Sequence, residues 1–114
     1  MNGPSDKRVL VRYPVDFLVV CRCRGEQQQG RALNLSSGGL LVTTPSLIPV
    51  GALTEISLAL ASGELFQFKG IVRHTSEDLG MGVEFVEVLP HHRERLVAYL
   101  SVLDSAFGSA PAPH

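Results

Sequence analysis

The sequence has no tryptophan, and its aromatic residues are only five phenylalanines and two tyrosines. A hydrophobic core built from this chain must therefore be mostly aliphatic. Only two cysteines occur among 114 residues that are 45% hydrophobic, which excludes a small disulfide scaffold. The uncharged apolar run near the start, residues 17–21, is too short to span a membrane and does not follow the plan of a signal peptide. These absences predict one compact cytoplasmic domain with no membrane span.

The chain also lacks a strong net charge, because its formal charge is −1 at pH 7. The charge is nevertheless uneven: residues 1–31 hold six basic and three acidic residues, whereas the remainder holds four basic and eight acidic residues. A positive end of this size attracts a small anion. It is too small for a protein that grips long nucleic acid through many phosphates.

Alternating apolar positions predict short strands along most of the chain. The first strand is expected from Val15, with Val15, Phe17, Val19, Cys21 and Cys23 on one face. Residues 25–30 are polar and are predicted to form a hairpin loop, and further strands are expected near 31–35, 40–44, 53–61, 66–73 and 81–85. This pattern predicts an all-β fold, a small six-stranded antiparallel barrel over residues 14–89.

The two ends of the chain have different patterns. Residues 1–13 lack apolar periodicity and are predicted to form a flexible arm. After Pro90, apolar residues recur at helical spacing, so a C-terminal α-helix over residues 90–107 is expected to pack on the barrel. Residues 108–114, with two prolines, are predicted to be disordered.

Two short motifs carry the functional interpretation. Residues 8–12 read R-V-L-V-R and place two arginines four positions apart, where the arm meets the first strand. Residues 34–39 read N-L-S-S-G-G and place an amide, a hydroxyl and paired glycines at a turn between strands. In this order, within a β pattern that ends in a helix, the chain resembles the PilZ domain family from about Lys7 to about Phe107. These bacterial domains are receptors for cyclic di-GMP, with the signatures R-x-x-x-R and [D/N]-x-S-x-x-G.

The chemistry of such a ligand suits these residues. Arginine offers a planar fork of donors that matches a phosphate or the O6/N7 edge of guanine, and its plane also stacks on bases. Asn34 offers an amide for a guanine edge or the sugar–phosphate, and Ser36 offers a hydroxyl. Glycines at 38 and 39 allow positive φ and a close approach of the backbone. The expected cyclic di-GMP site therefore consists of Lys7, Arg8, Arg12, Asn34, Ser36, Gly38 and Gly39.

The resemblance also implies a mode of action. The ligand would lie on the outer barrel surface between the two motifs, and its binding would change the conformation of the arm. Output would pass to a separate partner protein, with the receptor a monomer or a homodimer. Lys7 stands where the family often has an arginine or an apolar residue. Because that position is associated with binding one nucleotide or a stacked pair, the stoichiometry is left open.

Several alternatives stay open at the level of sequence. Arg8 and Arg12 could be solvated arm residues, and Asn34 and Ser36 could bond only to their own turn. The chain could also be a PilZ-like interaction module, of the kind used in pilus or motility assembly, that binds no nucleotide. The sequence shows no catalytic constellation and predicts that the protein is not an enzyme. The pair Cys21 and Cys23 lacks the second pair that a zinc site needs, so no metal site is predicted.

Overall fold

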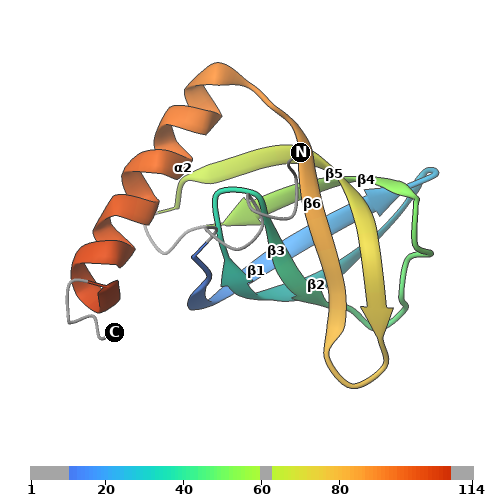
Figure 1. Ribbon diagram of the computed structural model, residues 1–114. Helices are drawn as coiled ribbons and strands as arrows, with labels where there is room; N and C mark the ends of the chain where they lie inside the picture. The colour runs from blue at the N-terminus through green and yellow to red at the C-terminus, as the bar shows by residue number, and fades with distance from the viewer. Residues whose placement is uncertain (1–10, 60–62, 109–114) are drawn as a thin grey trace, which may run out of the picture.

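Six antiparallel strands close into a barrel, with one helix beside it, in the computed structural model (Figure 1). The structure describes residues 11–59 and 63–108, with the side chains of residues 107 and 108 excepted. The strand order around the barrel is β1-β2-β3-β6-β5-β4. The strands are β1 (Tyr13–Cys23), β2 (Glu26–Leu35), β3 (Gly39–Thr43), β4 (Leu53–Ala59), β5 (Leu65–Ser76) and β6 (Gly80–Val88). The prediction of a six-stranded all-β barrel with a C-terminal helix is confirmed.

The hairpin between β1 and β2 is tighter than the sequence pattern predicted. The prediction of a loop over residues 25–30 was wrong, because β2 begins at Glu26 and the connection is Arg24 and Gly25 alone. Both residues have positive φ, 55° and 82°, as a two-residue turn requires when it follows the twist of the strands. The three glutamines therefore belong to β2, where Gln27, Gln28 and Gln29 pair with Arg22, Cys21 and Val20 of β1.

The barrel interior is aliphatic, as the shortage of aromatic residues predicted. Along β1, Val19 and Cys21 are each 1% exposed, and the other predicted inward positions pack against the same core. The remaining strands contribute Ala32, Leu35, Leu40, Val42, Ile56, Leu58, Phe66, Val72 and Met81, all 1% exposed or less. Phe68 and Phe85 stack with ring centroids 4.5 Å apart. Burial of this apolar surface is the main force that closes the barrel.

The C-terminal helix α2 (Pro90–Leu103) begins at the predicted proline and ends in a π-helical turn at Asp104–Gly108. Leu96 is fully buried and Leu103 is 9% exposed, so the predicted apolar stripe faces the barrel. Tyr99 packs on Phe17 of β1, with ring centroids 5.6 Å apart. No helix among residues 11–59 and 63–108 is long and apolar enough to cross a membrane.

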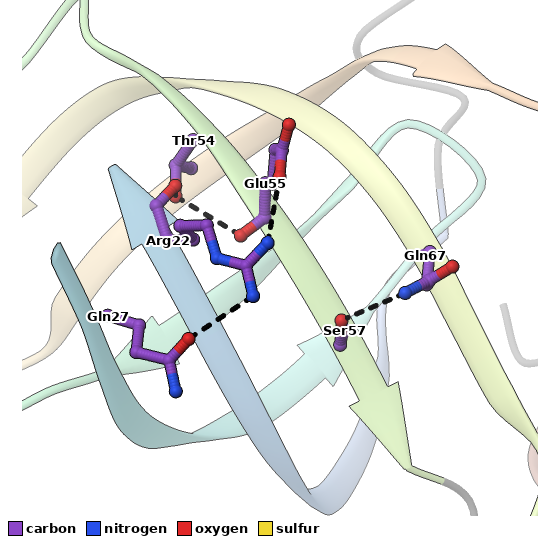
Figure 2. A network of polar contacts seen from close by, with 6 residues as sticks. All are labelled: Arg22, Gln27, Thr54, Glu55, Ser57 and Gln67. Atoms are coloured by element: carbon purple, nitrogen blue, oxygen red, sulfur yellow. Dashed lines mark hydrogen bonds and ion pairs between the residues drawn. The ribbon is translucent and has the colours of Figure 1, made fainter. Parts of the chain in front are cut away.

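The outer face of β1, β2, β4 and β5 carries a network of paired polar groups (Figure 2). Arg22 lies 3.6 Å from the Glu55 carboxylate and donates a 3.2 Å hydrogen bond to the Gln27 amide oxygen. Gln67 donates to Ser57 on the neighbouring strand. Exposed pairs of this kind contribute little to stability. Within the ion pair, Arg22 and Glu55 neutralise each other's charge.

Candidate functional site

A β-bulge in β2 turns Asn34 toward the outside of the barrel. Ala32 and Leu35 are both fully buried although they are three positions apart, which a regular two-residue alternation does not allow. The register of β2 against β3 shifts between Ala32 and Asn34, and the extra residue restores the inward direction at Leu35. As a result, Leu33 and Asn34 both face outward, and the Asn34 amide is available at the barrel surface.

Arg12 contacts Asn34 directly and so brings the two sequence motifs together. The Arg12 Nη1 atom donates a 3.0 Å hydrogen bond to the Asn34 Oδ1 atom across 22 positions of sequence. Arg12 lies immediately before β1, and the next residues, Tyr13 and Pro14, pair with Leu35 and Asn34 of β2. The strand pairing thus positions the second arginine of R-x-x-x-R beside the first residue of the second motif.

Ser36 holds the turn formed by residues 34–39, called here the motif turn. Its hydroxyl oxygen accepts hydrogen bonds from the N–H groups of Gly38, at 3.1 Å, and Gly39, at 3.2 Å. The hydroxyl also donates to the Gly39 carbonyl at 3.3 Å, and the residue is only 1% exposed. The Ser36 side chain therefore shapes the turn from within, which is one of the two alternatives that the sequence left open.

The glycines of the motif turn do not adopt the positive φ that the sequence analysis expected. Neither Gly38 nor Gly39 is among the described residues with positive φ, so that expectation was wrong. A Cβ atom on Gly39 would overlap the Val83 carbonyl oxygen of β6. The Gly38 carbonyl accepts a 2.8 Å hydrogen bond from the Phe85 N–H. The absence of a side chain at Gly39 thus lets the motif turn lie directly against β6.

A further arginine, which sequence reasoning missed, contacts the motif turn from the helix. Arg93 Nη1 in the first turn of α2 donates to the Ser37 carbonyl oxygen at 3.3 Å. Figure 1 shows α2 beside the end of the barrel at which the β2–β3 connection lies. The two residues are 56 positions apart, and no local pattern indicates that they meet.

Two expected site residues, Lys7 and Arg8, lie outside the described residues. Of the others, the structure brings Arg12 and Asn34 into contact and gathers Ser36, Gly38 and Gly39 into one turn. The expected flexible arm falls largely on residues 1–10 and the expected disordered tail largely on residues 109–114, which are likewise outside the described ranges.

A hollow elsewhere on the surface suits an anionic ligand less well. A cavity of about 280 Å³ on the outer face of β1, β4 and β5 contains none of the motif residues. Its charged groups are the pairs Arg22 with Glu55 and Lys69 with Glu87, which leave no excess positive charge. Over residues 11–59 and 63–108, no three His, Cys, Asp or Glu side chains gather in a way that could hold a metal ion. The motif turn is therefore the candidate anion site.

Comparison with known protein families agrees with the resemblance noted in the sequence. A family model described as the PilZ domain matches residues 6–101. No curated protein matches the chain at a significant level.

Solved structures with the same architecture share little sequence with this chain. The PilZ domain of YcgR from Escherichia coli, solved with c-di-GMP, has a TM-score of 0.71 and 15% identity, over 88% of this chain and 93% of that one. The Bacillus subtilis inhibitor of motility MotI/DgrA has a TM-score of 0.73 and 17% identity. That match covers 88% of this chain but only 52% of MotI, so the chain spans about half of that protein. The PilZ domain of CeSA from a cellulose-synthesizing bacterium has a TM-score of 0.63 and 18% identity, over 82% and 98% of the two chains.

Proposed function

Because this chain belongs to the PilZ domain family, we propose that it is a receptor for cyclic di-GMP that signals to a partner protein rather than an enzyme. The observation that carries the proposal is the hydrogen bond from Arg12 to Asn34. It places a guanidinium and an amide side by side at the barrel surface, each with further donors for a nucleotide. The YcgR domain, whose structure was solved with c-di-GMP, has the same fold.

The roles of the seven expected residues differ under this proposal. Arg12 and Asn34 contact the ligand, Arg12 through a phosphate or a guanine edge. Ser36, Gly38 and Gly39 act by fixing the motif turn, since the Ser36 hydroxyl is buried within it. Lys7 and Arg8 lie in the segment that precedes Arg12, and we propose that they close over the same ligand.

Calorimetric titration of the full chain with cyclic di-GMP tests the proposal and gives the stoichiometry. Arg12→Ala should weaken binding by more than about tenfold, because a lost bidentate contact is worth about 1–3 kcal/mol. Arg12→Lys should rescue poorly, because an ammonium group lacks the planar fork. Arg31→Ala is the matched control, since Arg31 is an exposed arginine of β2 whose charge pairs with Asp16 at 2.8 Å.

The ligand series separates base recognition from charge attraction. Cyclic di-AMP should bind much more weakly than cyclic di-GMP, because adenine presents an N6 amino group where arginine needs an acceptor. GMP should also bind weakly, because it offers one base and one phosphate. Equal affinity for both cyclic dinucleotides would show that arginine does not recognise the guanine edge. Complete absence of binding would favour the interaction module that needs no nucleotide.

Signalling requires that ligand binding changes the surface of the protein. We propose that the ligand draws the residues before Arg12 toward the motif turn, because its phosphates attract the cations Lys7 and Arg8 to the place where Arg12 already contacts Asn34. Hydrogen exchange of residues 6–13 should slow when cyclic di-GMP is added. If hydrogen exchange is unchanged at saturating ligand, the protein binds cyclic di-GMP without this conformational response.

A further inference from the structure

Most arginines in the described part of the chain have their charge neutralised by a carboxylate. The pairs are Arg22 with Glu55, Arg31 with Asp16, Arg73 with Glu84 and Arg95 with Glu64. Within residues 11–59 and 63–108, three arginines form no such pair: Arg12, Arg24 and Arg93. Arg24 lies in the β1–β2 hairpin, at the other end of β2 from the motif turn.

The other two arginines without a carboxylate partner both contact the motif turn. Arg12 donates to the Asn34 amide oxygen, and Arg93 donates to the Ser37 carbonyl oxygen. Both acceptors are neutral oxygens of the motif turn, and they are three positions apart. Two guanidinium groups, one from each end of the chain, therefore contact the same turn without a carboxylate partner of their own, an arrangement that favours an anion there.

We propose that Arg93 is a third arginine of the nucleotide site and binds a phosphate of the cyclic dinucleotide. The proposal rests on the proposed function, and it adds a residue of α2 to a site otherwise built from the motifs. One N–H group of Arg93 bonds to Ser37, which leaves the rest of its fork of donors for an anion. The helix that carries Arg93 is thereby a wall of the site and not only a cover for the barrel.

A phosphate contact is the role that the observations favour. Arg93 is exposed and contacts a backbone carbonyl, so it has no preformed plane or edge against which a base would be aligned. Its distinguishing feature is uncompensated charge, and charge alone attracts a phosphate. Lysine should therefore substitute for Arg93 much better than for Arg12.

The experiment compares cyclic di-GMP affinity, by calorimetry on the full chain, among four proteins: unaltered, Arg93→Gln, Arg93→Lys and Arg24→Gln. Arg93→Gln should weaken binding by about fivefold to tenfold, as expected for one lost hydrogen bond to a charged group at a solvated site. Arg93→Lys should stay within about threefold of the unaltered protein. Arg24→Gln removes the same charge about 30 Å away along β2 and should change affinity less than twofold.

Two further measurements separate ligand contact from a structural effect. The affinity difference between the unaltered protein and Arg93→Gln should shrink as salt is raised to about 0.5 M, because salt screens exposed charges. The Tm of Arg93→Gln should stay close to that of the unaltered protein, because Arg93 is an exposed helix residue. A loss of affinity that does not respond to salt would assign Arg93 a structural role and overturn the proposal.

The outcomes also separate this inference from the proposed function. If Arg12→Ala abolishes binding while Arg93→Gln binds like Arg24→Gln, then only the role of Arg93 is overturned. If the unaltered chain does not bind cyclic di-GMP, the proposed function fails and the role of Arg93 fails with it.

Discussion

Tyr13 donates a 2.6 Å hydrogen bond from its hydroxyl group to the Asp104 Oδ1 atom. The bond spans 91 positions and joins the first residue of β1 to the residue that follows α2. Tyr13 directly follows Arg12 and pairs with Leu35, so it neighbours one residue of each motif. The accepting carboxylate, together with burial, raises the pKa of Tyr13 above its ordinary value of 10.0, because both favour the neutral phenol.

This raised pKa predicts a loss of stability in alkali. The folded protein holds the Tyr13 proton more tightly than the unfolded chain does, so the stabilisation is complete below pH 10 and declines as the pH rises through the raised pKa. Tyr13→Phe should lower the Tm at pH 7 and should flatten the decline of Tm above pH 10. Thermal melts of both proteins between neutral and alkaline pH measure this difference.

A double-mutant cycle identifies the partner of Tyr13. Asp104→Ala should lower the Tm at neutral pH, and Tyr13→Phe combined with Asp104→Ala should cost less than the two single losses added together. Additive losses would show that the two side chains do not depend on each other.

The two thiols should differ sharply in reactivity. Cys21 is 1% exposed, and burial raises the pKa of its thiol from 9.0 to about 11, which disfavours the reactive thiolate. Cys23 is only partly buried, near the end of β1. A disulfide reagent at pH 8 should therefore modify Cys23 first and Cys21 at least about a hundredfold more slowly, at a rate set by opening of the barrel. Equal rates would show that the barrel opens readily near Cys21.

Alanine at two glycines distinguishes a backbone clash from a side-chain clash. A Cβ on Gly39 would overlap the Val83 carbonyl, whereas a Cβ on Gly82 would overlap the imidazole of His74, an exposed side chain that is free to rotate away. Gly39→Ala should destabilise the protein by about 2–3 kcal/mol, and Gly82→Ala by less than about 1 kcal/mol. Denaturant unfolding measures both values. Similar losses in the free energy of unfolding at the two sites would mean that the β6 backbone shifts as easily as the His74 side chain.

Truncation of two neighbouring helix residues tests how α2 is held. Leu96 is fully buried and Val97 is 53% exposed. Leu96→Ala should cost about 2–5 kcal/mol through loss of apolar burial and the cavity left behind, whereas Val97→Ala should cost less than about 0.5 kcal/mol. If Leu96→Ala leaves the denaturation midpoint unchanged, the helix does not dock on the barrel in solution.

The spacing of apolar residues and the position of proline were sufficient to predict the strand faces and the start of the helix. The alternation from Val15 to Cys23 predicted the inward face of β1, and Pro90 marked the start of the helix. The prediction of a long hairpin loop failed because the polar residues that suggested a loop belong to β2. The turn itself has two residues, and one of them, Arg24, adopts positive φ although it is not a glycine. The contact of Arg93 with Ser37 depends on where the helix lies against the barrel end, which periodicity does not specify.

We expect the motif turn to be completed late in folding. It rests on β6 through the Gly38 carbonyl and Phe85 N–H, and the β3–β6 pairing joins Gly39 to Glu84, 45 positions apart. Such distant pairings form slowly, because a long loop must close before the contact stabilises it. A chain that has not yet added β6 therefore has no completed turn for a ligand. We expect a ligand bound there to slow unfolding while leaving the folding rate unchanged.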